Sequence, residues 1–315
     1  MDNHLHAPRG VSQKVDPHLE HRKMQLDHWR TMSVGSDSPM RSLVSIEFNI
    51  TELCNRKCVF CPRIDPTVYP NQNLNMDLGV PEMVAREIKR LEIHPRLSFS
   101  GFGEPLLHKH LSRIIQSVSQ ILPEHIIEVN TNGDRLTAAR IRELFDVGLS
   151  FLYVNMYDGS HQVEELEALF TGAGVPRSQW KLRPHWTGSE DDFGLTLNNR
   201  AGSVHSATIS LRPLDRPLSR ACNYPFYKLL VDWNGDVLFC SNDWGREIVV
   251  GNVLNLSLDE IWLGRQMFEI RKNLAEGDRS RSPCNKCNVD GLLTGNESAD
   301  ILMEYLEQQE NHGLL

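Results

Sequence analysis

The sequence predicts an α/β fold, a partial (β/α)6 TIM-like barrel followed by a small C-terminal domain made of a β-hairpin and helices. Three observations lead to this expectation. Short apolar strands alternate with helical segments of about 10–15 residues, which is typical of a parallel sheet with helical crossovers. The predicted strands run into loops rich in Gly, Asn, Asp or Glu. A polar, irregular stretch then precedes Asn234-Gly235, a strong hairpin signal.

The barrel elements follow one another along the first half of the chain. Residues 1–42 are expected to form an extension with one short helix at about 18–32. The first strand is expected at 42–50, where apolar residues alternate with other residues. The next strands are expected at 97–100, 126–130 and 151–156, with 180–184 as a sixth strand. The helices between them are expected at 81–91, 111–122, 137–147 and 161–170.

The second half of the chain changes character after the last of these strands. Residues 188–217 form an expected linker or lid, and strands at 228–232 and 236–240 form the hairpin. Helices are expected at 258–263, 266–274 and 296–309. The predicted division is an extension at 1–42, a barrel at 43–187, the linker or lid at 188–217, a small domain at 218–295 and a C-terminal helix at 296–315.

Composition narrows the class of protein. The 315 residues carry a net charge of −8, which gives no basic footprint for nucleic acid. No window approaches the roughly 18 consecutive apolar residues of a membrane span, and the polar N-terminus lacks the apolar core of a signal peptide. We therefore expect a cytoplasmic protein without nucleic-acid or membrane partners. In that reducing compartment, seven cysteines are unlikely to form disulfides.

The first cysteine group has the spacing Cys54-x3-Cys58-x2-Cys61 and follows the first predicted strand. Thiolates this close can converge on one centre, either an iron–sulfur cluster or zinc. Three ligands would leave one iron of a cubane cluster open, because no nearby side chain offers an obvious fourth ligand. An open iron can bind a substrate or cofactor directly.

The run from Thr51 to Pro62, TELCNRKCVFCP, resembles the radical S-adenosylmethionine superfamily, including the aromatic Phe60 before the third cysteine. The resemblance implies a [4Fe-4S] cluster whose open iron chelates the amino and carboxylate groups of S-adenosylmethionine. Electron transfer, from a flavodoxin- or ferredoxin-type donor, would then cleave the sulfonium. The resulting 5′-deoxyadenosyl radical would abstract hydrogen from a small-molecule substrate.

Further strand-end motifs resemble the same family. In Gly101-Phe102-Gly103-Glu104-Pro105, the backbone and the nearby Glu104 would hold the cofactor ammonium, although Phe102 stands where Gly is common. The resemblance also marks other candidates for contact with the cofactor, which are Asn130 and Asn132 beside the ribose, Arg183, Asn155 and Arg200. Arg183 could instead be a surface residue, and Asn155 and Arg200 could instead contact the substrate.

The second cysteine group comprises Cys222, Cys240, Cys284 and Cys287. Four thiolates can close a cluster completely or bind structural zinc. The surrounding sequence resembles the SPASM or "twitch" appendage of radical enzymes. Since only four cysteines are available here, the resemblance implies one auxiliary [4Fe-4S] cluster, which could accept an electron from a substrate radical or have a purely structural role.

The expected reaction is hydrogen abstraction from a sugar, aminocyclitol or similar polyhydroxy substrate, ending in oxidation, elimination or epimerisation. The two clusters use every cysteine, so no thiol is left to return hydrogen, which disfavours epimerisation unless Tyr153 or Tyr157 acts instead; either tyrosine could simply pack. Asp158 could bind a substrate hydroxyl, act as a base, or cap a turn. Two alternatives are a peptide-modifying maturase and a zinc-stabilised binding protein without catalysis.

Overall fold

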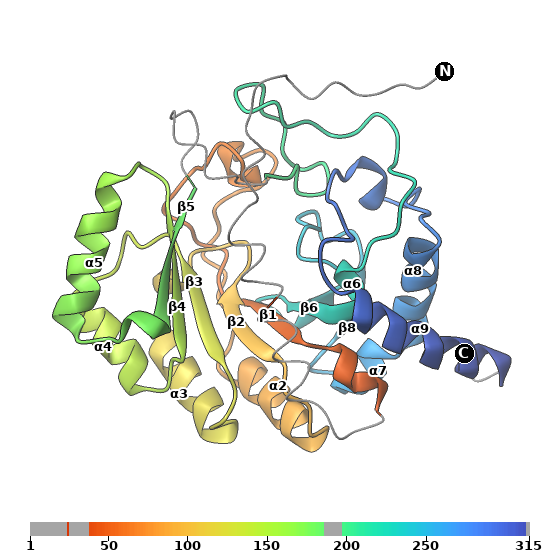
Figure 1. Cartoon of the computed structure of the whole chain (residues 1–315), viewed down its shortest axis with the longest axis horizontal. Coiled ribbons are helices and arrows are strands. Elements are labelled where there is room, and N and C mark those ends of the chain that lie inside the picture. Colours follow the sequence, from red (N-terminus) through yellow and green to blue (C-terminus); the bar gives the residue numbers. More distant parts are fainter. Residues whose placement is uncertain (1–23, 25–37, 186–196, 313–315) are drawn as a thin grey trace.

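The computed structural model describes residue 24 and the ranges 38–185 and 197–312. Apart from residue 24, the helix expected at 18–32 therefore lies outside the described residues, as do residues 188–196 of the expected linker. Figure 1 shows the two halves of the chain joined side by side, with the N-terminal half on the left and the C-terminal half on the right.

One sheet of eight strands runs through both halves, in the order β5-β4-β3-β2-β1-β6-β7-β8 (Figure 1). The first six strands in this order pair in parallel, and β6, β7 and β8 pair antiparallel. The strands are β1 (Ser45–Asn49), β2 (Arg96–Ser100), β3 (Ile127–Thr131), β4 (Phe151–Met156), β5 (Trp180–Pro184), β6 (Lys228–Val231), β7 (Asp236–Leu238) and β8 (Val249–Asn252).

The sixth barrel strand is β6, so the expectation that residues 180–184 form it is wrong. Trp180–Pro184 is the fifth strand, β5, at the open edge, and β6 pairs in parallel with β1 on the other side. The physical reason is that β6 has an apolar run of its own, Leu229 to Val231, whose backbone completes the parallel ladder beside β1. The same strand starts the predicted hairpin with β7.

Helices cover one face of the parallel strands. Figure 1 shows α2 to α5 along the outside of β1 to β5, and α7 to α9 around the C-terminal strands. The longer helices are α2 (Gly79–Arg90), α3 (Leu111–Ile121), α4 (Ala138–Asp146), α5 (His161–Ala173), α8 (Arg265–Ala275) and α9 (Asn296–Asn311). The shorter ones are α6 (Tyr224–Tyr227) and α7 (Leu258–Trp262), and 3-10 turns occur at η1 (Pro39–Ser42), η2 (Pro62–Ile64), η3 (Pro105–Leu107), η4 (Arg177–Gln179) and η5 (Cys284–Lys286).

Alternate residues of the strands separate an apolar face from a polar one, because successive side chains of a strand point to opposite sides. Residues such as Ile46, Phe48 and Phe99 belong to the main hydrophobic core with the helices. The opposite, inner face carries polar and charged side chains at paired positions, for example Glu47 opposite Ser98. A complete TIM barrel fills this interior with bulky branched residues instead.

The predicted elements agree with the structure within a few residues. The helix expected at 81–91 begins earlier, at Gly79, and the helix expected at 161–170 continues to Ala173 before Gly174 takes a left-handed φ of 73°. The described part of the predicted linker contains turns and one isolated bridge, Ser206 to Leu211. Among the described residues, none of the helices has the length and apolarity to span a membrane.

Candidate active site

The first cysteine group lies on the loop that follows β1. Cys54, Cys58 and Cys61 are each partly buried, and the Cys61 N–H donates to the Cys58 carbonyl at 3.0 Å. The Cys54 N–H donates to Asn71 Oδ1 at 2.8 Å, which fixes the start of the loop. The three thiols are close enough to influence one another's ionisation. The structure thus carries all three thiols on one loop after β1.

The electrostatics of these thiols fit a metal centre. Burial raises the pKa of Cys54 and of Cys61, and burial with repulsion from the two other thiols raises the pKa of Cys58 to about 12. Thiolates are the form that binds iron. The positive charge of a bound centre would therefore offset both the cost of burying the thiolates and the repulsion between them. The donor set therefore suits an iron–sulfur cluster bound by three cysteines.

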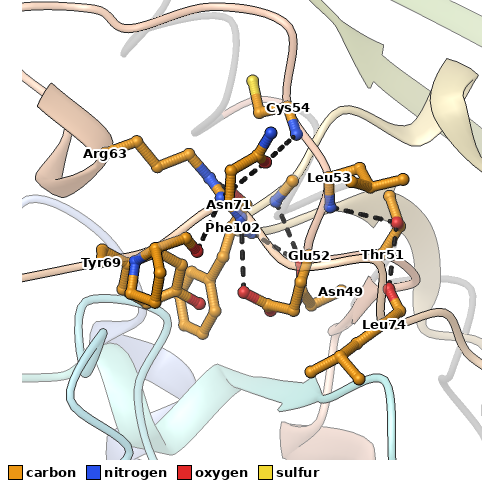
Figure 2. A network of polar contacts seen from close by, with 12 residues as sticks. Asn49, Thr51, Glu52, Leu53, Cys54, Arg63, Tyr69, Asn71, Leu74 and Phe102 are labelled. Atoms are coloured by element: carbon orange, nitrogen blue, oxygen red, sulfur yellow. Dashed lines mark hydrogen bonds and ion pairs between the residues drawn. The ribbon is translucent and has the colours of Figure 1, made fainter. Parts of the chain in front are cut away.

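Arg63 stabilises this cysteine loop. Its guanidinium donates to the Phe102 carbonyl at 2.7 Å and to Asn71 Oδ1 at 3.2 Å, and it pairs with Glu52 at 3.3 Å (Figure 2). Both charged side chains are almost fully buried. Asn71 in turn holds Cys54, so the buried pair fixes the loop through a short chain of contacts.

A second arginine ties the same cluster of acids to the C-terminal half. Arg246 pairs with Glu52 and with Asp232 at 2.5 Å each, and donates to the Tyr69 hydroxyl at 2.7 Å. Asn49 Nδ2 donates to the same two carboxylates at 2.6 and 2.7 Å. The hairpin that carries Cys240 is thereby connected to the loop that carries the first cysteine group.

The glycines after β2 are required by close backbone approach. Gly101 has a φ of 104°, and a Cβ at Gly103 would lie 1.9 Å from the Thr51 carbonyl oxygen. Asn49 Oδ1 accepts from the N–H of Phe102 at 2.8 Å and of Gly103 at 3.2 Å. The predicted motif therefore packs directly against the segment that leads into Cys54.

The Glu104 carboxylate is engaged within the protein. It accepts from Thr131 Oγ1 at 2.6 Å, from the Asn132 N–H at 2.8 Å and from the Leu106 N–H at 3.0 Å. Burial raises its pKa to about 7 despite these bonds. Asn132 also donates to Asn55 Oδ1 at 2.9 Å, which joins the end of β3 to the cysteine loop.

Arg56, between the first two cysteines, binds two other strand-end loops. It pairs with Asp134 after β3 at 2.5 Å and with Asp158 after β4 at 2.7 Å. The hydrogen bond from Arg56 lowers the pKa of Asp158. A carboxylate held in this way is a weaker base, so the geometry supports the loop-fixing role of Asp158 more than the basic one.

Tyr157 lies against the cysteine loop. Its ring stacks on Phe60 at 5.8 Å and contacts His185 at 5.5 Å, and Arg56 lies 5.1 Å from its centre. Burial and the nearby Cys58 thiol raise the pKa of Tyr157. The tyrosine is therefore part of an aromatic layer beside the first cysteine group.

Four further predicted residues share the inner face of the sheet. The strand registers place Asn130 opposite Tyr153 and Asn155 opposite Arg183. Tyr153 is 9% exposed. Asn155 Nδ2 donates to the Thr131 carbonyl at 3.4 Å, while its buried Oδ1 accepts no hydrogen bond from the described residues. Asn155 thus offers an acceptor to a ligand at this face.

Arg200 stands between the two cysteine groups. Its charge acts on Cys61, and the next residue, Ala201, lines the cavity of the second group. Arg200, Ala201 and Gly202 have successive φ values of 48°, 50° and 88°, a conformation that costs energy for residues other than glycine. Asn199 secures the turn by donating to the Lys286 carbonyl at 2.7 Å.

The second cysteine group surrounds a cavity of about 20 Å³ in the C-terminal half, in which the four sulfurs share the wall with apolar side chains. Burial raises the pKa of all four thiols, to about 12 for Cys284. N–H groups of Asn242 and Val289 donate to Cys240 and Cys287 at 3.4 and 3.5 Å. A hollow ringed by four thiols suits a cluster larger than a single ion. Within 38–185 and 197–312, no three His, Cys, Asp or Glu side chains meet as a single-ion site.

Several site residues were missed by the sequence reasoning. Arg56, Arg246 and Asn49 act through partners far apart in the chain, which no local pattern reveals. Glu47 and Glu128 could have been found, because a charged residue alternates with apolar ones in each strand. His108 and His110 lie together after η3, where His108 contacts the Met76 carbonyl at 3.1 Å, a structural position.

Two family models match the chain. The Radical SAM superfamily matches residues 48–168, and the SPASM model, an iron–sulfur cluster-binding domain, matches residues 222–288. Each match contains one of the two cysteine groups.

Curated relatives and solved structures agree with these matches. The S-adenosyl-L-methionine-dependent 2-deoxy-scyllo-inosamine dehydrogenase of Niallia circulans is 27% identical over 251 residues, which cover 79% of this chain and 94% of that protein. The GTP 3′,8-cyclase of Mycobacterium ulcerans is 30% identical over 39% of this chain and 36% of its own length. The crystal structure of BtrN in complex with AdoMet and 2-DOIA superposes with a TM-score of 0.67 at 26% identity, covering 81% of this chain and 96% of that chain.

Proposed function

The chain is a radical S-adenosylmethionine enzyme with a C-terminal SPASM-type domain, and from this premise we propose that it oxidises one alcohol carbon of an aminocyclitol. The observation that carries the proposal is how much of this chain is similar to one relative. The similarity to 2-deoxy-scyllo-inosamine dehydrogenase covers 79% of this chain and 94% of that protein, whereas the similarity to the cyclase covers about a third of the cyclase's length.

The inner face of the sheet supports a substrate rich in hydroxyl and amino groups. Glu47 pairs there with Lys228, and Glu128 pairs with Arg96 at 2.9 Å. Glu128 Oε2 and Asn155 Oδ1 are buried, and neither accepts a hydrogen bond within the part of the chain that the structure describes. Buried acceptors without partners are costly unless a ligand supplies donors, which hydroxyl and ammonium groups do.

The cysteines have separate tasks in this proposal. Cys54, Cys58 and Cys61 would hold the [4Fe-4S] cluster with an open iron, and the other four would hold the auxiliary [4Fe-4S] cluster. When bound, the cofactor and clusters supply a hydrogen-atom acceptor at the strand ends and a one-electron acceptor in the C-terminal domain. Oxidation of an alcohol then removes a hydrogen atom from carbon, one electron, and the hydroxyl proton, which passes to water.

The remaining predicted residues would position the cofactor and substrate. Gly101 and Gly103 keep the backbone after β2 close to the cysteine loop, where their main-chain groups can face the cofactor. Asn130 and Asn155 would contact the cofactor or substrate from the inner face. Arg200, whose buried Nε donates to no partner among the described residues, would bind an anionic or hydroxyl group between the two clusters.

The electron donor and compartment follow from the chemistry. We propose a flavodoxin- or ferredoxin-type donor, since the first cluster must receive single electrons before the cofactor is cleaved. We also place the protein in the cytoplasm, where a reducing environment keeps seven thiols available for iron.

Anaerobic reconstitution tests the proposal. The wild-type chain should bind about eight irons, and a variant lacking the Cys284 and Cys287 thiols about four, following the stoichiometry of two cubane clusters. With 2-deoxy-scyllo-inosamine deuterated at its carbinol carbons, deuterium should appear in 5′-deoxyadenosine and a ketone should form. Replacing Cys54, Cys58 and Cys61 by Ala should abolish both products. Stoichiometric zinc without iron–sulfur absorption, or deoxyadenosine free of deuterium with every aminocyclitol tried, would contradict the proposal.

A further inference from the structure

The cavity of the second cysteine group has a buried cation in its wall. Arg279 is 2% exposed and lines the cavity beside the four thiols. The wall also contains the apolar side chains of Phe239, Leu274 and Val289. Because electrostatic interactions are stronger in surroundings of low dielectric constant, a charge at this position acts strongly on the contents of the cavity.

Among the described residues, three neutral carbonyl groups hold this guanidinium. Its Nε donates to the Arg220 carbonyl at 2.9 Å, Nη1 to the Val289 carbonyl at 2.8 Å, and Nη2 to the Ala221 carbonyl at 2.8 Å. Within the described part of the chain, Arg279 forms no ion pair with a carboxylate. The three carbonyls fix its direction and satisfy its donors without cancelling its charge.

The carbonyls that hold Arg279 flank two of the cysteines. Arg220 and Ala221 come directly before Cys222, and Val289 lies two residues after Cys287. Gly277, with a φ of 81°, makes the turn that brings this part of the chain against Arg220, whose backbone would lie 3.3 Å from a Cβ there. The fold therefore places the charge between two cysteine-bearing segments.

The wall contains one acid as well. Asp243 lines the cavity, but its two carboxylate oxygens accept from the main-chain N–H groups of Glu247 and Ile248 at 3.0 and 2.9 Å. Those bonds spread its charge over the backbone of its own loop. Burial of an unpaired cation costs several kcal/mol, and an anionic occupant of the cavity would offset that cost for Arg279.

We propose that Arg279 is a positioning residue that raises the reduction potential of the auxiliary cluster, so that the cluster can accept the electron of a substrate radical. The inference rests on the proposed function, in which this cluster is the one-electron acceptor. Four thiolates outweigh the positive charge of a cubane core, so the loaded site is anionic. Accepting an electron makes it more negative, and a nearby fixed cation stabilises the reduced form more than the oxidised form.

The step balances in electrons and protons. After the deoxyadenosyl radical has taken the hydrogen atom, the substrate carbon holds one unpaired electron and still bears its hydroxyl group. That electron passes to the auxiliary cluster, which is reduced by one electron. The O–H bond breaks, its proton goes to water, and its electron pair completes the carbonyl double bond.

The experiment is a redox titration of the auxiliary cluster in the full-length chain, followed by electron paramagnetic resonance. Replacing Cys54, Cys58 and Cys61 by Ala leaves that cluster as the only source of signal. In this background, R279Q removes the charge, R279K keeps it, and R281Q removes the charge of a nearby exposed arginine as the matched control. We expect R279Q to disfavour reduction at least tenfold, which lowers the potential by about 59 mV for one electron. R279K and R281Q should shift it by less than half as much.

Each result of the titration either supports or contradicts the role of Arg279. If R279Q shifts the potential no more than R281Q does, or if R279K shifts it as far as R279Q does, the charge of Arg279 does not set the potential. If R279Q no longer retains its four irons, R279K decides: a potential close to that of the parent supports the inference, and a tenfold shift overturns it. If the parent chain binds no iron in this background, the proposed function itself fails, which separates the two failures.

Discussion

Replacing Gly103 by Ala should damage the site through the backbone of the cysteine loop. A Cβ built there lies 1.9 Å from the Thr51 carbonyl oxygen and 2.9 Å from that of Leu53, and both obstacles are main-chain atoms. Real Cβ contacts are essentially never shorter than 3.0 Å, so the two segments must separate by about an ångström. The hydrogen bond from the Glu104 N–H to the Leu53 carbonyl, 2.8 Å long, would be lost or weakened.

The size of the effect follows from overpacking. Forcing a methyl group into a close-packed site costs about 1–3 kcal/mol, and about 1.4 kcal/mol corresponds to a tenfold change in rate if it is lost at the transition state. We therefore expect urea unfolding of G103A to give a free energy of unfolding about 1–3 kcal/mol lower than that of the wild type. The variant should form 5′-deoxyadenosine about 5- to 150-fold more slowly if the same cost is felt at the transition state.

The matched control is Gly172→Ala. Gly172 lies near the end of α5, and a Cβ there meets nothing within 4 Å. Since Ala is favoured over Gly in a helix by about 0.5–1 kcal/mol, G172A should be as stable as the wild type or more stable, with unchanged cofactor cleavage. If G103A matched G172A in urea unfolding and in deoxyadenosine formation, the close approach of the two loops would not constrain the site.

Three other changes test the charged contacts. R246Q removes the cation shared by two buried acids and should lower the free energy of unfolding in urea by about 2–4 kcal/mol. This value is smaller than that for a fully buried pair because the arginine is partly exposed. A loss below about 0.5 kcal/mol, the usual range for neutral surface changes, would contradict the connecting role of Arg246. D158N should change deoxyadenosine formation by less than about threefold, whereas R56Q, which loses both of its acidic partners, should lower stability and activity more; equal losses would favour a direct catalytic role for Asp158. Burial opposes ionisation of Glu47, but Lys228 and other partners lower its pKa below 4.5, so its contribution to stability is present above that pH and is lost as the pH falls through the folded value. The wild-type free energy of unfolding should therefore decrease below pH 4.5 more steeply than that of E47Q, and identical slopes would show that this carboxylate is not stabilised.

Local patterns were sufficient for most of the fold. Alternating apolar residues located the strands, and β4 and β5 have the predicted bounds. The spacing of Cys54, Cys58 and Cys61 and the glycines after β2 also carry their signal within a few residues, because close ligands and close backbone approach depend on neighbours in the chain.

The sequence alone thus determined the α/β class, the two cysteine groups and the motifs at the strand ends. Only the tertiary structure decided that β6 is the sixth barrel strand, since parallel pairing with β1 joins segments about 180 residues apart and leaves no local mark. It also decided which charges meet: Arg246 reaches Glu52 across the two halves of the chain, and Arg279 turns toward three carbonyls beside the cysteines. Such contacts depend on how distant segments are brought together, and a sequence read locally contains no record of that distance.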